Sequence, residues 1–332
     1  MVSILESLIR IPSPSYQEEQ IGRFLVEVLT KRGYIVTTQS VSPNRFNVLA
    51  MTTEDPIVLL NSHMDTVSPY CEYRKREDTI WGRGACDAKG QIAAMISAGD
   101  RLREQGILNF ALLFVVGEEV ESDGAKLAAN MNLPSKYVVI GEPTDNKLAR
   151  AQKGTLVFRV RAHGIEGHSC FPSHGDSAIH RLVSYLDSWL KINWGSDPVF
   201  GETTVNFGKI SGGSAMNVIA GGATAEGIFR VATSLAQIKK VLREFPSENI
   251  DLEFTSESEP LALKTLKGFE TQVVSFGSDA SYLRPLGDVL IFGPGSIGVA
   301  HSEHEHIKIA DLEQGTHLLE NIVKQLLKES LT

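Results

Sequence analysis

Residues 57–65 read IVLLNSHMD, a short apolar run that leads into a histidine and an aspartate. A run of this length without polar alternation is typical of a strand that is buried on both faces. Further runs of the same character are ALLFVVG (111–117), YVVIG (137–141) and DVLIFG (288–293). We therefore expect a buried sheet whose strands each end in polar residues.

Helical patterns separate these runs. The segments 89–106 and 311–329 place apolar residues at helical spacing, and 122–131 indicates a shorter helix. Ser15 and Glu18 have the spacing of a capping box, which predicts a helix that runs on to Gly33. The alternation of strands and helices predicts an α/β fold with a largely parallel sheet and helices on both faces.

The pattern changes near residue 154, where TLVFRVRAHG alternates as a strand with one solvated face does. Residues 154–260 then favour the order β-α-β-β-α-β, a ferredoxin-like unit. We predict three segments: a larger α/β domain in two parts, 1–153 and 261–332, and a smaller inserted domain, 154–260.

The bulk composition excludes several classes of protein. The chain has 332 residues, of which 42% are hydrophobic and 22% charged, and its net charge is −8. This balance predicts a globular protein without a nucleic-acid partner. Its three cysteines favour a reducing compartment. The sequence offers no signal peptide and no apolar run of membrane-spanning length, so we expect a cytoplasmic protein without membrane contact.

Polar residues collect where the predicted strands end. His63 and Asp65 follow the first strand, Glu118 and Glu119 the second, and Glu142 the third. Ligands in open α/β sheets bind beyond the carboxyl ends of the strands, so these side chains should meet. Histidine and carboxylate ligands suit zinc, and paired metals bridged by a carboxylate are a recurrent hydrolytic device.

Each residue also has a plain structural explanation. Asp87, in WGRGACDAKG (81–90), could simply cap a helix, and Glu118 and Glu119 could be solvated loop acids. The stretch HSEHEH (301–306) could be a charged surface loop. The convergence of several such positions favours a metal site over each separate explanation.

A series of motifs then carries a family resemblance over essentially the whole chain. In order, they are HMDTVSP, GRGACDAKG, GEEVES, GEPTD, HGIEGHS, GGSAMNVIA and GPGSIGVAHSEHE. Together they resemble the co-catalytic zinc aminoacylase and carboxypeptidase family, which includes acetylornithine deacetylase and succinyl-diaminopimelate desuccinylase. The resemblance implies a zinc-peptidase-like mixed sheet and two Zn²⁺ ions, with Co²⁺ or Mn²⁺ able to substitute.

Carried over by position, the resemblance also implies a ligand set. His63 and Glu142 would bind one metal, Glu119 and His301 the other, and Asp87 would bridge the two. His304 and His306 fall outside the ligand position.

Two further residues receive catalytic roles from the resemblance. Asp65 would orient His63, and Glu118 would act as the general base that takes a proton from the attacking water and delivers it to the departing amine.

The resemblance implies further roles nearer the substrate. The resemblance implies that 1–153 and 261–332 form the catalytic metal-binding domain and that 154–260 serve for dimerisation and as a lid. His168 would reach the reacting carbonyl across a homodimer that forms through residues 154–260. Asn217 and Arg230 would contact the substrate, and the guanidinium of Arg230 is suited to a carboxylate. Relatives usually carry aspartate two residues before this arginine, where this chain has Ile228. Ser278 or Asp279 could meet a substrate amino group, although a plain turn there is equally compatible with the sequence.

We therefore expect a metal-dependent amide hydrolase that acts on a small N-acyl amino acid. Acetylornithine deacetylase activity is the first expectation, because the stretch GEPTDNKLARAQKG (141–154) resembles that branch. The short segment between His63 and Asp87 also resembles hydrolases of carrier-protein-linked lysine or ornithine, which are the alternative. Desuccinylase and dipeptidase or carboxypeptidase activities stay open. Outside the enzyme class, the alternative is a non-catalytic protein that binds amino-acid derivatives.

Overall fold

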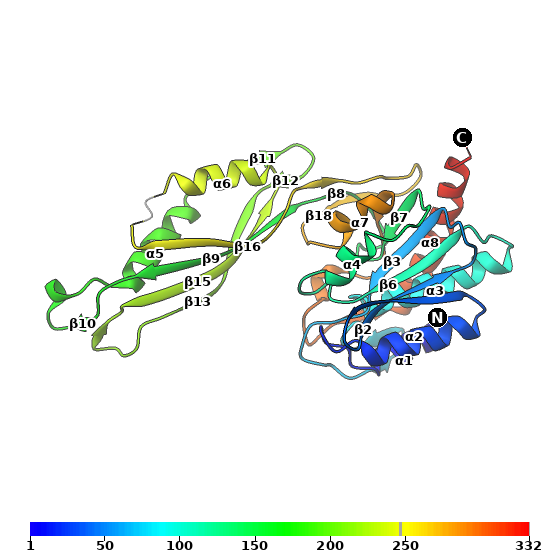
Figure 1. Ribbon diagram of the computed structural model, residues 1–332, viewed down its shortest axis with the longest axis horizontal. Coiled ribbons are helices and arrows are strands. Elements are labelled where there is room, and N and C mark those ends of the chain that lie inside the picture. The colour runs from blue at the N-terminus through cyan, green and yellow to red at the C-terminus, as the bar shows by residue number, and fades with distance from the viewer. Residues whose placement is uncertain (246–247, 332) are drawn as a thin grey trace. The chain divides into compact units, whose positions relative to one another are not determined.

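The computed structural model describes residues 1–245 and 248–331, and its central element is a six-stranded sheet (Figure 1). The sheet is mixed: β6, β3, β7 and β19 run parallel, while β1 and β2 pair antiparallel at one edge. In the order of the sheet the strands are β1 (Ile35–Ser42), β2 (Arg45–Met51), β6 (Phe110–Val115), β3 (Val58–His63), β7 (Tyr137–Ile140) and β19 (Asp288–Ile291). The predicted α/β class with a mixed sheet is confirmed.

Helices cover both faces of this sheet. Leu60 and Leu112 belong to the core that the long helices form on one face. Leu113 points to the opposite face, as does Asn47, whose side-chain amide donates to the carbonyl of Gly124 in α4 (2.8 Å). The helices on the first face are α1 (Val2–Ile9), α2 (Glu19–Lys31), α3 (Lys89–Glu104) and α8 (Ile309–Glu329), and the second face carries α4 (Asp123–Ala128) and α7 (Ala280–Leu283).

One local prediction is wrong. Ser15 and Glu18 do not form a capping box, because α2 begins at Glu19 and has no side-chain cap. The hydroxyl of Ser15 instead donates to the carboxylate of Asp65 (2.8 Å), and Glu18 pairs with Arg45 (2.9 Å). Tertiary partners with full charges compete successfully with the local helix cap.

Several short strands complete this part of the chain. β20 (His306–Lys308) pairs with β5 (Thr79–Trp81), which also pairs with β4 (Arg74–Arg76). A second small sheet has the order β17 (Leu261–Ala262), β8 (Leu148–Gln152) and β18 (Thr271–Val274). None of the helices in the described residues is both long and apolar enough to cross a membrane.

The chain divides into two compact units. Unit 1 comprises residues 1–150, 263–272 and 278–332, and unit 2 comprises residues 151–262 and 273–277. The two ends of the range 151–262 lie side by side, because Gln152 in β8 pairs with Leu261 in β17 in an antiparallel ladder. The predicted domain ranges 1–153, 154–260 and 261–332 stay a prediction, since compactness alone does not test independent folding.

Unit 2 has the strand order β13-β15-β9-β16, with all neighbours antiparallel. Alternate residues of β9, such as Phe158 and Val160, are buried against α5 and α6, while Arg159 faces outward and pairs with Glu226 (2.8 Å). This alternation gives one covered and one solvated face. The elements are β9 (Gly154–His163), α5 (Ala178–Leu190), β13 (Thr204–Gly212), β15 (Gly222–Val231), α6 (Leu235–Arg243) and β16 (Ile250–Ser258), with the pairs β10 (Gly167–His168) with β14 (Val218–Ile219) and β11 (Ser196–Asp197) with β12 (Gly201–Glu202).

Candidate metal centre

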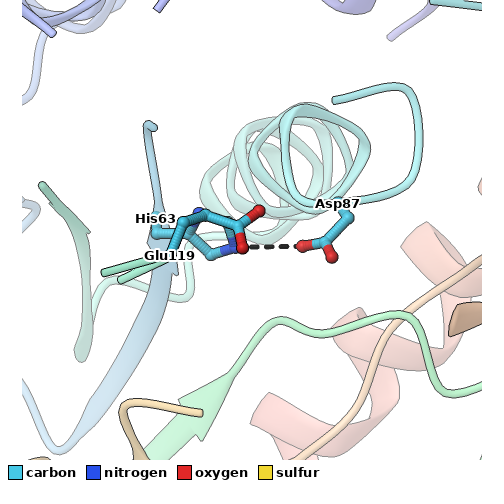
Figure 2. A group of neighbouring side chains, drawn as sticks. All are labelled: His63, Asp87 and Glu119. Atoms are coloured by element: carbon cyan, nitrogen blue, oxygen red, sulfur yellow. Dashed lines mark hydrogen bonds and ion pairs between the residues drawn. The ribbon is translucent and has the colours of Figure 1, made fainter. Parts of the chain in front are cut away.

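A group of histidines and carboxylates lies at the carboxyl ends of the parallel strands in unit 1. His63 is the last residue of β3, Glu119 follows β6, and Asp87 lies just before α3 (Figure 2). One ligand atom from each of these three residues lies within 4.8 Å of the others. His301, from the loop before β20, joins them through its Nε2 atom, which is 3.0 Å from the carboxylate of Glu119.

Asp87 occupies the middle of this group. Its Oδ1 atom is 3.0 Å from Nε2 of His63, as the dashed line in Figure 2 marks. Its Oδ2 atom is 3.3 Å from Nε2 of His301. The two oxygens of one buried carboxylate thus face two histidines from opposite ends of the chain, an arrangement that a bridging ligand of two cations needs.

Asp65 contacts both the imidazole of His63 and the loop that follows β6. The Nδ1 atom of His63 is 3.0 Å from the backbone carbonyl of Asp65 and 3.4 Å from its carboxylate. A proton on Nδ1 leaves the lone pair of Nε2 free for a metal. The same carboxylate accepts the backbone N–H groups of Glu118 (3.1 Å) and Glu119 (3.2 Å), and therefore fixes the start of the loop that carries both glutamates.

The electrostatics of the group fit divalent cations. Burial raises the pKa of Glu118 and of Glu142 well above that of an exposed glutamate, and neighbouring carboxylates raise it further. The carboxylates of Asp87 and Glu119 raise the pKa of His301 to about 10. So many acids in one buried place attract positive charge, and imidazole with carboxylate is a donor set that suits zinc, cobalt or manganese. The side chains present therefore fit the implied metals.

Asp279 is a further buried acid near this group. It is 1% exposed, and burial raises the pKa of its carboxyl group to about 7. Its charge is close enough to that of Glu118 to raise the pKa of the glutamate. Ser278, its neighbour, is also buried, and its hydroxyl accepts the backbone N–H of Ala280 (3.3 Å). Their suggested contact with a substrate amino group stays a prediction.

The three site residues predicted in unit 2 do not lie together within that unit. His168 and Asn217 are neighbours, since the carbonyl of Asn217 accepts the N–H of the residue after His168 (3.1 Å). They lie beyond the end of the sheet where β15 begins at Gly222, whereas Arg230 is close to the other end of β15. Eight residues of strand separate these ends by about 27 Å. One small substrate cannot contact all three residues of a single subunit.

Two residues that contact the site were missed by the sequence predictions. Ser15 donates to Asp65 from 50 residues away, and Glu305 accepts the backbone N–H of Asp87 (3.1 Å) from 218 residues away. Ser15 lies outside the motifs that carry the family resemblance, and Glu305 is the last residue of GPGSIGVAHSEHE (293–305) without standing at its ligand position. The signal that could have found Glu305 is its place in HSEHEH (301–306), whose histidines indicate metal binding and whose glutamates are equally typical of a solvated loop.

Comparison with known proteins gives a consistent result. The sequence model of peptidase family M20/M25/M40 matches residues 59–325. A probable carboxypeptidase of Aspergillus flavus is 32% identical, over 98% of this chain and 87% of its own length. A tripeptidase of Staphylococcus aureus superposes with a TM-score of 0.82 at 22% identity, over 98% of both chains. A dinuclear metal-binding peptidase of Bacillus subtilis has a TM-score of 0.68 at 14% identity, over 98% of this chain and 97% of that one.

Proposed function

Because the chain belongs to peptidase family M20/M25/M40, we propose that it hydrolyses the amide bond of a small substrate with a free α-carboxylate, using two divalent cations. The family makes it a metal-dependent hydrolase of amide bonds. The observation that carries the dinuclear part is the placement of Asp87, whose two oxygens face His63 and His301. His63 with Glu142 on one side of Asp87, and Glu119 with His301 on the other, would hold the cations, which we propose to be zinc.

The chemistry of the proposal needs one base. Bound cations would supply a water of lowered pKa and an electrophile for the carbonyl oxygen. Glu118 would take the proton of that water as the water oxygen bonds to the amide carbon. The same carboxyl group would then give the proton to the amine nitrogen when the carbon–nitrogen bond breaks. A carboxyl group whose pKa is raised by burial is suited to both transfers near neutral pH.

The substrate class is drawn from several observations. Arg230 is a half-buried cation in unit 2 that has a hydrogen bond to the hydroxyl of Thr155 (3.3 Å), and it would pair with the α-carboxylate. The Aspergillus relative, named a probable carboxypeptidase, favours cleavage of a C-terminal residue. The resemblance of residues 141–154 favours N-acetylornithine. We rank small peptides and N-acyl amino acids equally as the class to test first.

A homodimer is part of the proposal. His168 lies on an exposed strand, far along the sheet from Arg230. If both contact one substrate, they come from different subunits, and residues 154–260 would form the interface. Sedimentation of the protein as a monomer at every concentration, with full activity, would exclude this role of His168.

Steady-state hydrolysis by zinc-loaded protein tests the function. The panel contains N-acetylornithine, N-acetylcitrulline, N-succinyl-diaminopimelate, simple dipeptides and a carrier-linked lysine, each with a partner whose α-carboxylate is amidated. We expect turnover of one acyl class, loss of at least about a hundredfold in kcat for Glu118→Gln, and poor turnover of amidated partners.

Glu121→Gln provides the matched control, because Glu121 is exposed in the same loop and should behave as wild type. If metal-loaded protein turns over no member of the panel, hydrolysis is contradicted and a protein that only binds amino-acid derivatives becomes the better description.

A further inference from the structure

Glu305 is a buried acid that lies next to the candidate metal centre without being one of its proposed ligands. It is 1% exposed. Its Oε1 atom accepts the backbone N–H groups of Cys86 (3.2 Å) and Asp87 (3.1 Å). A carboxylate that accepts two successive N–H groups fixes the direction of that peptide segment. The segment in question carries the side chain that faces both His63 and His301.

A buried arginine holds Glu305 in turn. Nη1 of Arg83 donates to Oε2 of Glu305 (2.7 Å), and Nε of Arg83 donates to the carbonyl of Pro69 (3.1 Å). Both members of this ion pair are at most 2% exposed. Charge-assisted hydrogen bonds in a buried place are short and directional. The carboxylate of Glu305 therefore has little freedom to turn away from Asp87.

The backbone of Glu305 also belongs to the loop that carries His301. Its carbonyl accepts the N–H of Gly82 (3.1 Å), and the next residue, His306, starts a strand opposite Trp81. The loop from His301 is thus anchored at its far end to the segment that leads to Asp87. Glu305 connects the two segments through its side chain and its backbone.

We propose that Glu305 is a positioning residue that sets the spacing between Asp87 and His301 and thereby the affinity for the second cation. The inference rests on the proposed dinuclear site. Asp87 can serve two cations only if its carboxylate stays between the two histidines, and His301 contributes to one cation alone. A shift of either segment would weaken one binding site before the other. Residues that orient metal ligands typically change affinity 10- to 100-fold when they are replaced.

Glu305→Asp is the variant that separates position from charge. It keeps a carboxylate for Arg83 but shortens the side chain by one methylene, so that the N–H groups of Cys86 and Asp87 lose their acceptor. Glu305→Gln is the second variant, since it keeps the length and removes the charge. Glu303→Gln is the control, because Glu303 lies in the same loop with an 83% exposed side chain.

The experiment is a zinc titration of metal-free protein by calorimetry, with metal content measured by mass spectrometry and folding checked by circular dichroism. The wild type and Glu303→Gln should bind two equivalents alike. Folded Glu305→Asp should bind the first equivalent nearly as the wild type does and the second about 10- to 100-fold more weakly. Its cobalt absorption spectrum at two equivalents should differ from that of the wild type.

Two results would overturn the inference. One is a folded Glu305→Asp protein that binds both equivalents as tightly as the wild type. The other is a wild type that binds only one equivalent, which would also overturn the dinuclear proposal. A wild type that binds two equivalents but hydrolyses no substrate would contradict the proposed function alone and leave the effect of Glu305 measurable.

Discussion

The ion cluster of Arg45 allows a stability prediction with a worked magnitude. The side chain of Arg45 is 7% exposed and that of Glu18 is fully buried, with two contacts between them of 2.9 and 3.0 Å. Arg45 also donates to Asp123, the first residue of α4 (3.1 Å). Arg45→Met would leave the Glu18 carboxylate buried without a partner. Removing one member of such a pair destabilises a protein by about 3–5 kcal/mol.

The neighbouring pair of Arg23 and Glu19 provides a matched comparison. It joins the same two residue types within α2, but the arginine side chain is 71% exposed. Arg23→Met should therefore change the free energy of unfolding by at most about 0.5 kcal/mol. The double variant Arg45→Met/Glu18→Gln should recover part of the loss, because it no longer leaves an unpaired charge at the fully buried position 18.

Urea unfolding followed by circular dichroism measures the free energy of unfolding of the wild type and of the three variants. A loss below about 1 kcal/mol for Arg45→Met, or one no larger than that of Arg23→Met, would refute the reasoning. Such a result would mean that the buried carboxylate finds another partner or takes up a proton at little cost.

Three further predictions concern the metal centre and its surroundings. Removal of divalent metal with EDTA should lower Tm and added Zn²⁺ should restore it, since cations at a hundredfold excess over Kd stabilise by about 2.7 kcal/mol; an unchanged Tm would contradict the metal site. Ser15→Ala removes the hydrogen bond to Asp65 and should lower stability by about 1.5–3 kcal/mol together with zinc affinity, as unfolding and zinc titration would show; wild-type values in both would exclude a role for Ser15. Burial lowers the pKa of Lys89 to about 7, so between pH 7 and about 10.5 the unfolded chain binds a proton that the folded chain releases, and stability rises with pH. The free energy of unfolding of Lys89→Met, relative to that of the wild type, should therefore be higher at pH 6 than at pH 9. An equal difference at both pH values in urea unfolding would be the contrary result.

The fold and the centre of the site could be predicted from the sequence, because the patterns that indicate them lie within short segments of the chain. Buried parallel strands are continuous apolar runs, and the residues after each run must lie at one edge of the sheet. For this reason the amino-acid sequence alone predicts that His63, Glu119 and Glu142 lie close together. The helix predicted over 89–106 is α3 (Lys89–Glu104) in the structure, although it is buried on all sides from Lys89 to Gly99 and not along one apolar stripe.

The contacts that orient the site residues could not be predicted in this way. Ser15 and Glu305 reach Asp65 and Asp87 across 50 and 218 residues, and each lies in a stretch that is equally typical of something else. Ser15 has the spacing of a helix cap, and Glu305 lies among histidines that suggest metal binding. A local sequence pattern indicates only the hydrogen-bond partners that lie close along the chain. Ser15 and Glu305 bind partners that are far away along the chain and that only the tertiary fold brings close.

Because Gln152 lies opposite Leu261, we expect that the chain between them can be removed. Directly opposed residues of an antiparallel ladder can be joined by a two-residue turn, so residues 153–260 could be replaced by Asn-Gly without moving either strand. The shortened protein would keep every proposed metal ligand and lose His168, Asn217 and Arg230. Cation binding and substrate selection could then be measured on separate molecules.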